Sequence, residues 1–362
     1  MRIAQVAPIN HKISPSSVYG IYSNVAYICD GTVNAVHDVT LFASKDAETK
    51  AEVKGVVKQN TRDAGLLDKD VLHMNHLNLS KCFQEHEHFD LIHSHYSTLG
   101  TFYAPLVDIP VVHSVHNPLP KSFIDIKDHV KKQRFISFSL AQRKLYPDLN
   151  WIANIYHGID QNTYGYSEKS DGYLFFLGRV IEEKGAHIAI EAAKAANKRL
   201  IISGMSRPDD PYWQKEIEPH IDGVNIQFVG PSDLKKKIAL LQGADAVLFP
   251  TRRDEPFGLV MIEAMSCGTP VIGFDDGAVP EVIKDGVSGY VVKSAREMID
   301  GINNLDKISR KNCRKRAEMY FSVEKMVNGY VKVYQQVIND WKYKKNKVLI
   351  TDPYTRLPSN VK

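Results

Sequence analysis

The densest group of residues able to do chemistry lies in PTRRDEPFGLVMIEAM, where an apolar run ends at Pro250 and a helix is expected to begin near Phe257 and Gly258. The first amides of a helix are unpaired and its dipole favours negative charge, so a helix start beside a glycine can accept a phosphate. Glu263 would lie roughly 7.5 Å further along the axis, at about 1.5 Å per residue, within reach of a sugar hydroxyl. Alternatively, Glu255 only complements the helix dipole and Glu263 is solvated, although an unpaired carboxylate would be costly to bury in its apolar context.

A second group of charged residues lies in LFFLGRVIEEKG, where an apolar run is followed by Arg179 and, five residues later, by Lys184. The leaving group of a sugar nucleotide is a diphosphate, and an arginine with a lysine can stabilise its negative charge without a metal ion. The same two cations could instead pair on the surface with the neighbouring Glu182 and Glu183. Either way, both are expected to follow a strand directly.

Four histidines lie at the ends of two further apolar runs, DLIHSH and VVHSVH. Alternation along a strand places His113 and His116 on opposite faces, so the two are not expected to share a ligand. We expect His116 to reach a cleft, and the alternative is a histidine whose ring is satisfied by backbone groups. His93 and His95 are interpreted as packing or gating residues rather than as metal ligands.

The common nucleotide-binding motifs are missing from the sequence. It contains neither GxGxxG after its first apolar run nor GxxxxGK[ST], which disfavours a standard dinucleotide site and a P-loop. Gly20, in PSSVYGIYSNVAYI, could let the backbone approach a ligand at a helix start, although a single glycine is weak support. The one DxD sequence, Asp68 to Asp70, lies in a helix-like stretch and is interpreted as a solvated face. We therefore expect no metal in the site and no cofactor.

Strands and helices must bring these candidate site residues together. Twelve short apolar runs, each closed by Gly, Pro, Ser or His, are typical of buried strands in parallel sheets. Helix-compatible stretches lie between most of them, which favours an α/β architecture. Two sheets of about six strands fit two doubly wound, Rossmann-like domains better than one sheet of twelve. The runs are RIAQVAP, HDVTLFAS, FDLIHSH, IPVVHSVH, RFISFS, NWIANIYHG, GYLFFLGR, KRLIISG, VNIQFVG, ADAVLFP, TPVIGFD and GYVVK.

The expected domains face each other across one cleft, because ligands of open α/β sheets bind beyond the carboxyl ends of the strands. We expect residues 1–162 to form the N-terminal domain and residues 163–325 to form the C-terminal domain. Residues 326–362 form a helix and tail that pack back toward the N-terminal domain. The join falls in YHGIDQNTYGYSEKSDG, which is rich in turn-forming residues.

Composition excludes several other classes of protein. The 362 residues are 43% hydrophobic and 24% charged, and 46 basic against 42 acidic residues give a net charge of +4, too small to indicate nucleic-acid binding. Four scattered cysteines disfavour a disulfide framework or a zinc ribbon. No window is apolar enough for a membrane span, and we expect a cytoplasmic protein. The lysines of WKYKKNK at 341–347 suggest a weak peripheral contact with anionic lipid, or simply a solvated helix end.

Taken together, these motifs resemble the family 4 retaining glycosyltransferases of the GT-B fold. The resemblance covers nearly the whole chain and is strongest from Leu174 to Val292, where GRVIEEKG, VNIQFVG, FPTRRDEPFGLVMIEAMSCGTPVIG and GAVPEVIKDGVSGYVV follow in the family's order. Its most specific signal is E-x7-E, filled by Glu255 and Glu263. In the family this motif and the Arg/Lys pair bind a sugar nucleotide without a metal ion. The resemblance therefore implies that residues 163–325 bind the nucleotide sugar and that residues 1–162 form the acceptor-side domain.

The resemblance implies roles for individual residues. Glu255 lies against the donor sugar, Glu263 takes the ribose hydroxyls, Arg179 and Lys184 hold the diphosphate, and His116 faces the transferred sugar. The implied catalytic set is His116, Arg179, Lys184 and Glu255. The implied substrate-binding set adds the following residues to Arg179, Lys184 and Glu255: Gly20, Gly230, Pro256, Phe257, Gly258, Leu259 and Glu263.

The chain departs from the family pattern at three places. The family's GG-x-E loop aligns with Tyr19 to Tyr22, where one glycine and the glutamate are missing. His157 replaces the asparagine of the family's NG-[IV]-D turn, which keeps Asp160. In GAVPE, Ala278 replaces a usual second glycine while Glu281 is kept. The first departure leaves the acceptor undefined.

The expected reaction transfers a sugar from a nucleotide diphosphate sugar, with UDP or GDP as the expected nucleotide, to a hydroxyl group, with retention at the anomeric carbon. The acceptor could be a carbohydrate, a lipid-linked molecule or a small molecule. Base choice is expected to depend on the loops after VNIQFVG and KRLIISG. Two alternatives stay open: a GT-B enzyme that epimerises or hydrolyses a sugar nucleotide, and a sugar-binding protein without catalysis.

Overall fold

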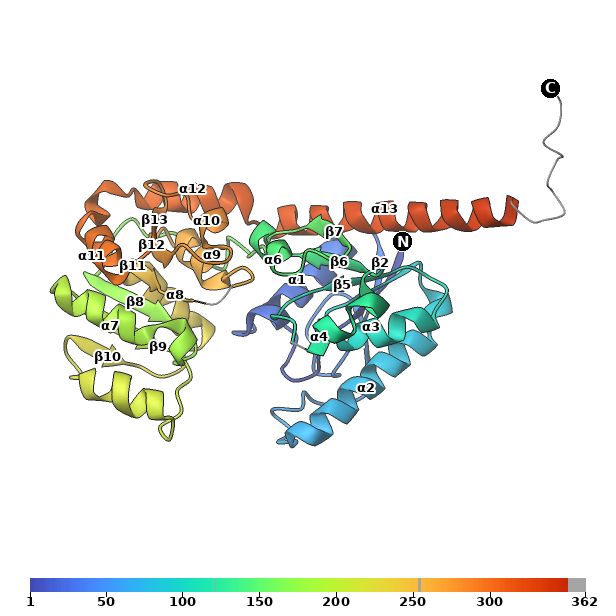
Figure 1. Cartoon of the computed structure of the whole chain (residues 1–362), viewed down its shortest axis with the longest axis horizontal. Coiled ribbons are helices and arrows are strands. Elements are labelled where there is room, and N and C mark those ends of the chain that lie inside the picture. Colours follow the sequence, from blue (N-terminus) through green and yellow to red (C-terminus); the bar gives the residue numbers. More distant parts are fainter. Residues whose placement is uncertain (121, 253–254, 351–362) are drawn as a thin grey trace, which may run out of the picture.

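The structure is a computed structural model that describes residues 1–120, 122–252 and 255–350, without the side chains of 124 and 345–350. It forms two α/β lobes joined side by side, with one long helix, α13 (Val323–Ile350), running over the first lobe (Figure 1). We use "N-terminal lobe" for residues 1–154 together with α13, and "C-terminal lobe" for residues 173–320. The predicted tail DPYTRLPSNVK lies outside the described residues.

The N-terminal lobe contains a seven-stranded parallel sheet in the order β3-β2-β1-β4-β5-β6-β7. Successive side chains of a strand point to opposite faces, and β2 shows this directly: Leu41 packs on the side of α1, whereas Phe42 packs on the side of α2. The strands are β1 (Arg2–Val6), β2 (Asp38–Ala43), β3 (Glu52–Gly55), β4 (Leu91–Ser94), β5 (Val111–Ser114), β6 (Arg134–Ser137) and β7 (Trp151–Asn154). The helices are α1 (Gly20–Asn34), α2 (Asp68–Gln84), α3 (Leu99–Tyr103), α4 (Ser122–Asp125), α5 (Lys127–Val130) and α6 (Leu140–Leu145).

The C-terminal lobe contains a six-stranded parallel sheet in the order β10-β9-β8-β11-β12-β13, a doubly wound arrangement. Phe175 faces the core under α8 to α10 and α12, while Leu174 and Phe176 face the core under α7 and α11. The strands are β8 (Tyr173–Leu177), β9 (Arg199–Ser203), β10 (Ile226–Phe228), β11 (Ala244–Phe249), β12 (Val271–Phe274) and β13 (Gly289–Val292). The helices are α7 (Ala186–Ala195), α8 (Leu234–Gly243), α9 (Leu259–Ser266), α10 (Val279–Val282), α11 (Ala295–Asn303) and α12 (Arg310–Tyr320).

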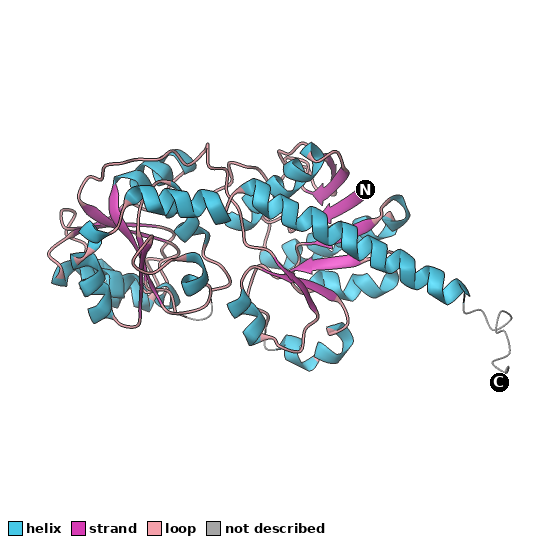
Figure 2. Ribbon diagram, turned by 90° about the horizontal axis from the view of Figure 1, so that it is seen from above, coloured by secondary structure: helices cyan, strands magenta, loops and turns pink. Residues whose placement is uncertain are grey.

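Helix α13 returns the chain to the N-terminal lobe and completes its core, as seen from above in Figure 2. Its fully buried Tyr330 and Tyr334 pack with Ile3 of β1 and Ile28 of α1. The crossing is close: a Cβ added at Gly31 would lie 2.3 Å from a methyl carbon of Val327.

The predicted fold class is confirmed, with thirteen strands among the described residues rather than twelve. All twelve apolar runs contain a strand. The additional strand, β3, has the sequence EVKG and pairs only with β2, at the edge of its sheet. An edge strand needs no continuous apolar run, which is why hydrophobicity did not indicate it. Within the described part of the chain, no helix combines the length and apolar character needed to cross a membrane.

Candidate active site

A cavity of about 650 Å³ separates the two lobes at the carboxyl ends of β5, β8 and β11. It brings together five predicted site residues: His116 from the N-terminal lobe, and Arg179, Lys184, Glu255 and Pro256 from the C-terminal lobe. Each of the four charged or polar residues follows a strand in sequence, so the sheet topology explains why they meet. The remaining lining residues are Asn117, Pro118, Leu145, Tyr146, Ile181, Glu183, Thr251 and Arg252.

The backbone around Arg179 is held on both sides by an extension of the β8–β9 pairing. The amide of Gly178 donates to the carbonyl of Ser203 (3.1 Å), and the amide of Val180 donates to the carbonyl of Met205 (2.8 Å). A Cβ at Gly204 would lie 1.7 Å from the carbonyl oxygen of Gly178, so this approach requires glycine. The side chain of Arg179 is exposed and forms no ion pair with any residue the structure describes. Its charge is therefore available to a ligand.

Lys184 forms an ion pair with Glu255 across the wall of the cavity, rather than with the neighbouring Glu182. The pair is partly buried, with 24% and 17% of the two side chains exposed. Lys184 ends the short 3-10 helix η3 (Glu182–Lys184), and the next residue, Gly185, has a φ of 74° that favours glycine. The ion pair neutralises a carboxylate that would otherwise repel a phosphate, while Arg179 keeps the local charge positive.

Arg252 is a cation of this cavity that the sequence motifs did not single out. It lies two residues after Pro250 and lines the cavity. Its guanidinium lies 5.1 Å from the ring centroid of Phe274, a cation–π contact that orients it. Its position directly after a predicted strand was the feature of the sequence that could have identified it as a site residue.

The predicted helix start is found at α9, with Gly258 as its N-cap at φ 81°. Phe257 is only 2% exposed, and its ring packs against Tyr156 and Phe321 at 6.0 and 5.8 Å between centroids. Leu259 meets Gly20 of the other lobe, where an added Cβ would lie 2.0 Å from Leu259 Cδ1. Phe257, Gly258 and Leu259 do not line the cavity, so their contacts with a donor stay a prediction.

Glu263 is buried rather than solvated, which rules out the alternative of an exposed face, and it does not line the cavity, so its role toward the ribose stays a prediction. It is 8% exposed, and its Oε1 accepts hydrogen bonds from Lys237 Nζ and Tyr164 Oη, each at 2.6 Å. Lys237 comes from α8, and no motif relates it to Glu263. The ion pair explains how a carboxylate is buried in the apolar context of α9.

We expect Lys237→Met to destabilise the protein by about 3 kcal/mol, because removing one partner of a buried ion pair leaves an uncompensated charge. The double variant Lys237→Met/Glu263→Gln should recover part of this loss. Lys215 forms an ion pair with Glu216 but is 83% exposed, so Lys215→Met should change the free energy of unfolding by less than about 0.5 kcal/mol. Urea unfolding measures all three, and equal stability of Lys237→Met and the natural protein would contradict the expectation.

His116, just after β5, reaches the cavity, whereas His113 within β5 is fully buried with its ring 5.5 Å from that of Phe135. This division follows from the alternation of side chains along the strand. Burial lowers the pKa of His116 to about 3, so its ring is neutral at neutral pH. His93 and His95 are buried behind it.

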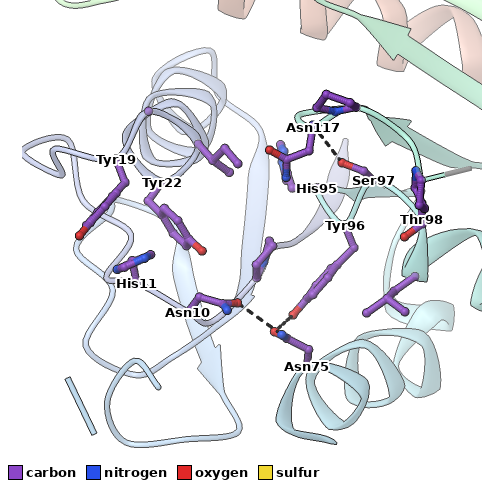
Figure 3. A pocket seen from close by; sticks show the side chains of 16 residues that line it. Asn10, His11, Tyr19, Tyr22, Asn75, His95, Tyr96, Ser97, Thr98 and Asn117 are labelled. Atoms are coloured by element: carbon purple, nitrogen blue, oxygen red, sulfur yellow. Dashed lines mark hydrogen bonds between the residues drawn. The ribbon is translucent and has the colours of Figure 1, made fainter. Parts of the chain in front are cut away.

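A second cavity of about 560 Å³ lies in the N-terminal lobe and shares Asn117 and Pro118 with the first (Figure 3). Its described lining contains amides, hydroxyls and aromatic rings but no Lys, Arg, Asp or Glu. His11 stacks on Tyr19 with 3.8 Å between ring centroids. The lining residues are Pro8, Asn10, His11, Tyr19, Gly20, Ile21, Tyr22, Asn75, His95, Tyr96, Ser97, Thr98, Leu99, Asn117, Pro118 and Pro120.

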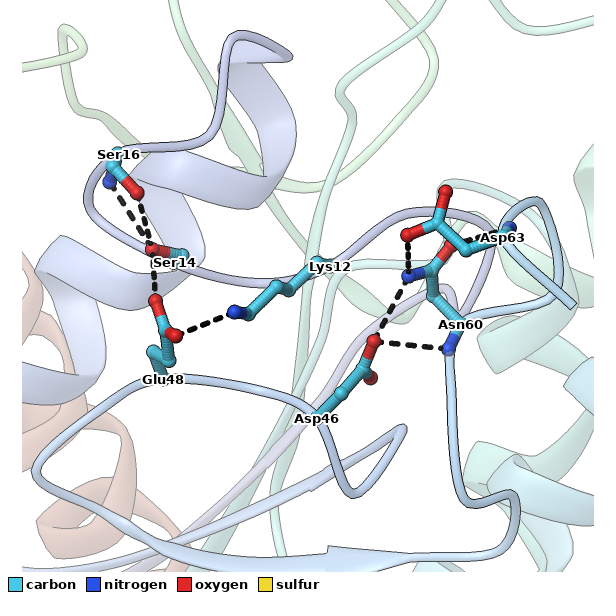
Figure 4. A network of polar contacts seen from close by, with 7 residues as sticks. All are labelled: Lys12, Ser14, Ser16, Asp46, Glu48, Asn60 and Asp63. Carbon is cyan, nitrogen blue, oxygen red and sulfur yellow. Dashed lines mark hydrogen bonds and ion pairs between the residues drawn. The ribbon is translucent and has the colours of Figure 1, made fainter.

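The loop that carries His11 and Tyr19 is fastened to the loop after β2 by a polar network (Figure 4). Lys12 forms an ion pair with Glu48 at 2.5 Å, and the hydroxyl of Ser14 donates to the other oxygen of Glu48 at 2.9 Å. This loop precedes the stretch where the family's GG-x-E pattern is missing. Its conformation here is held by side chains.

Glu281 links the two lobes. It accepts hydrogen bonds from the first amides of α6, those of Leu140 (2.8 Å) and Ala141 (2.7 Å), and from the hydroxyl of Tyr156 (2.9 Å). A carboxylate is favoured at a helix N-terminus. Gly230, by contrast, lines neither cavity, and its carbonyl accepts a hydrogen bond from Ser203 Oγ (2.8 Å).

Comparison with known proteins supports the interpretation of the two lobes. Residues 20–161 match the family model "Glycosyltransferase Family 4", and residues 165–320 match the model "Glycosyl transferases group 1". An uncharacterized glycosyltransferase of Methanocaldococcus jannaschii is 24% identical over 90% of this chain and 98% of its own.

Two solved structures show the same fold. Sucrose-phosphate synthase from Thermosynechococcus elongatus superposes with a TM-score of 0.75 at 17% identity, over 94% of this chain and 100% of that one. HepE from Anabaena, solved in complex with UDP and glucose, has a TM-score of 0.67 at 20% identity, over 94% and 99%. The two family models, together with this fold, define a glycosyltransferase with the GT-B fold. The chain belongs to the family 4 type of glycosyltransferases, whose two family models together span both lobes.

Among the described residues, no group of three or more His, Cys, Asp or Glu side chains is arranged to hold a metal ion. Three of the buried histidines, His93, His95 and His116, instead form hydrogen bonds with other side chains.

Proposed function

We propose that the protein is a retaining glycosyltransferase that transfers a sugar from a nucleotide diphosphate sugar to an acceptor hydroxyl. The observation that carries this proposal is the cavity wall after β8 and β11, where Arg179, Lys184 and Arg252 gather at the mouth between the lobes. Cations fixed where negative charge develops stabilise a leaving diphosphate. The proposal assigns this work to side chains rather than to a metal ion.

The acceptor is proposed to bind in the second cavity, which shares the lining residues Asn117 and Pro118 with the first. Its aromatic rings and uncharged polar groups suit a hydroxyl-rich acceptor. In the proposed reaction the bond between the anomeric carbon and the diphosphate oxygen breaks, and the acceptor oxygen attacks the same face. The acceptor's proton passes to the departing phosphate oxygen, so retention needs no protein nucleophile.

Binding of UDP, GDP, ADP and their sugars tests the donor half of the proposal through a thermal-shift panel. A ligand at 100 times its Kd stabilises the folded state by about 2.7 kcal/mol. Since HepE was solved with UDP and glucose, UDP-glucose is the first sugar nucleotide to test. We expect one nucleotide to raise the Tm selectively and Arg179→Ala to weaken that shift. No shift with any nucleotide at millimolar concentration would contradict the proposal.

Product analysis with and without an acceptor separates transfer from the alternative, epimerisation or hydrolysis of a sugar nucleotide. The proposed enzyme forms a new glycoside only when an acceptor hydroxyl is present. An epimerase or hydrolase converts the donor equally well alone.

Peripheral membrane contact and a cytoplasmic location stay predictions. Of the residues behind the lipid expectation, Tyr343 is 68% exposed, whereas the ring of Trp341 lies 5.1 Å from the guanidinium of Arg134. The side chains of Lys345 and Lys347 lie outside the described residues.

A further inference from the structure

A continuous chain of hydrogen-bonded side chains runs from the interlobe cavity through the core of the N-terminal lobe to α13. Six contacts of 3.0, 2.8, 3.1, 2.7, 2.8 and 3.3 Å join its seven members, all of them buried. In order from the cavity these are His116, His95, Gln5, Tyr334, His93, Ser114 and Tyr330. Buried polar groups of this kind are costly unless every partner is satisfied.

The amide of Gln5 gives the chain a direction. Its Oε1 faces His95 Nε2, and its Nε2 donates to the hydroxyl of Tyr334. Because a carbonyl oxygen only accepts, His95 must carry its proton on Nε2. Burial lowers the pKa of His95 far below its usual value, so the ring has no second proton. His95 Nδ1 is then an acceptor, and the proton between the two rings belongs to His116 Nε2.

The same direction continues beyond Gln5. The hydroxyl of Tyr334 accepts from Gln5 and can donate to His93 Nδ1, which leaves His93 Nε2 to donate to Ser114 Oγ. Every member of the chain can therefore be uncharged. At the cavity end, His116 is left with a proton on Nε2 and a bare lone pair on Nδ1.

We propose that Gln5 and His95 are positioning residues that hold His116 in its Nε2–H tautomer, so that Nδ1 accepts a hydrogen bond from a sugar hydroxyl in the interlobe cavity. This inference rests on the proposed function for the identity of the ligand. A site built to accept a substrate O–H discriminates against an analogue that lacks it, because a buried polar group is then left unpaired. The tautomer thus makes the site selective for a hydroxyl at one position of the sugar.

The tautomer is tested directly by NMR of the full-length protein labelled with ¹⁵N in histidine, without any ligand. The His116 signals are identified by their absence in His116→Gln. We expect Nε2 to be protonated and Nδ1 to be unprotonated between pH 6 and pH 8. A protonated Nδ1, or a doubly protonated ring, would overturn the proposal whether or not the enzyme transfers sugars.

Gln5→Met removes the acceptor that fixes His95 and should leave His116 in a mixture of tautomers. Turnover of UDP-glucose, or of GDP-mannose if that binds instead, should fall about tenfold, as for loss of one hydrogen bond. Tyr330→Phe is the matched control, since Tyr330 is equally buried on α13 but lies at the far end of the chain. It should leave both the His116 signals and turnover unchanged.

If Gln5→Met does not fold, Tyr334→Phe removes the hydroxyl that receives the Gln5 amide and should have the same effect on His116. An unchanged His116 tautomer in the folded Gln5 or Tyr334 variant would refute the positioning role. The expected tautomers in a protein that binds no sugar nucleotide would support the positioning role and refute the proposed function.

Discussion

Arg179→Ala and Lys184→Ala should each lower kcat/KM for sugar transfer by about 10²–10³, the usual loss when one preorganised charge contact is removed from a transition state. Arg179 lines the interlobe cavity without an ion-pair partner in the described part of the chain, so its charge acts on the ligand. Lys184 is different, because its removal also leaves Glu255 unpaired beside the diphosphate. The double variant Lys184→Ala/Glu255→Gln should therefore be more active than Lys184→Ala alone.

Steady-state kinetics with a donor found in the thermal-shift panel measure these effects. Lys215→Ala is the control, because Lys215 belongs to the same lobe but is 83% exposed and lines neither cavity. Near-normal turnover in both Arg179→Ala and Lys184→Ala would rule out their leaving-group role.

Stability should fall steeply as the pH drops below about 6.5. Five buried histidines have pKa values lowered from 6.5, chiefly by burial, and the pKa values of His113 and His116 are lowered to about 3. The other three are His93, His95 and His157. Below pH 6.5 the unfolded chain binds protons that the folded chain does not. Lowering the pH therefore shifts the equilibrium toward the unfolded state.

The expected loss of stability is large because the five histidines act in the same direction. Each contributes up to about 1.4 kcal/mol per pH unit between the unfolded and folded pKa values. Lowering the pH from 7 to 5 should therefore cost at least about 5 kcal/mol, comparable with the whole stability of many domains.

Urea unfolding at a series of pH values measures the slope of the free energy of unfolding against pH. His113→Leu, which removes one buried histidine outside both cavities, should make the slope shallower. His73 is exposed on α2, so His73→Gln should leave it unchanged. Equal stability at pH 7 and pH 5 would show that the buried rings take up protons without unfolding.

Much of the fold could be predicted because parallel strands buried on both faces are nearly continuous apolar runs, and twelve such runs became strands. The meeting of His116, Arg179, Lys184 and Glu255 could also be predicted, since each follows a strand and parallel strands end at one edge. The edge strand β3 could not, because its EVKG sequence lacks that pattern.

The contacts of Glu263 were not predictable in the same way. Its partners Lys237 and Tyr164 come from segments without a motif, and the chain brings them together only by tertiary packing. The same holds for the cavity of the N-terminal lobe, whose lining comes mostly from loops. Loop conformation depends on side-chain contacts such as Lys12 with Glu48, which no periodicity in the sequence indicates.

The position of α13 has a consequence for how the protein is made. Its Tyr330 and Tyr334 fill a core whose other members include Ile3 and Ile28, so the first lobe is completed by residues that are synthesised after the whole second lobe. The apolar surface of the N-terminal half that α13 covers stays exposed while the whole second lobe is synthesised. The second lobe can fold during that time, and nascent chains should pass through an intermediate in which the later half is native first.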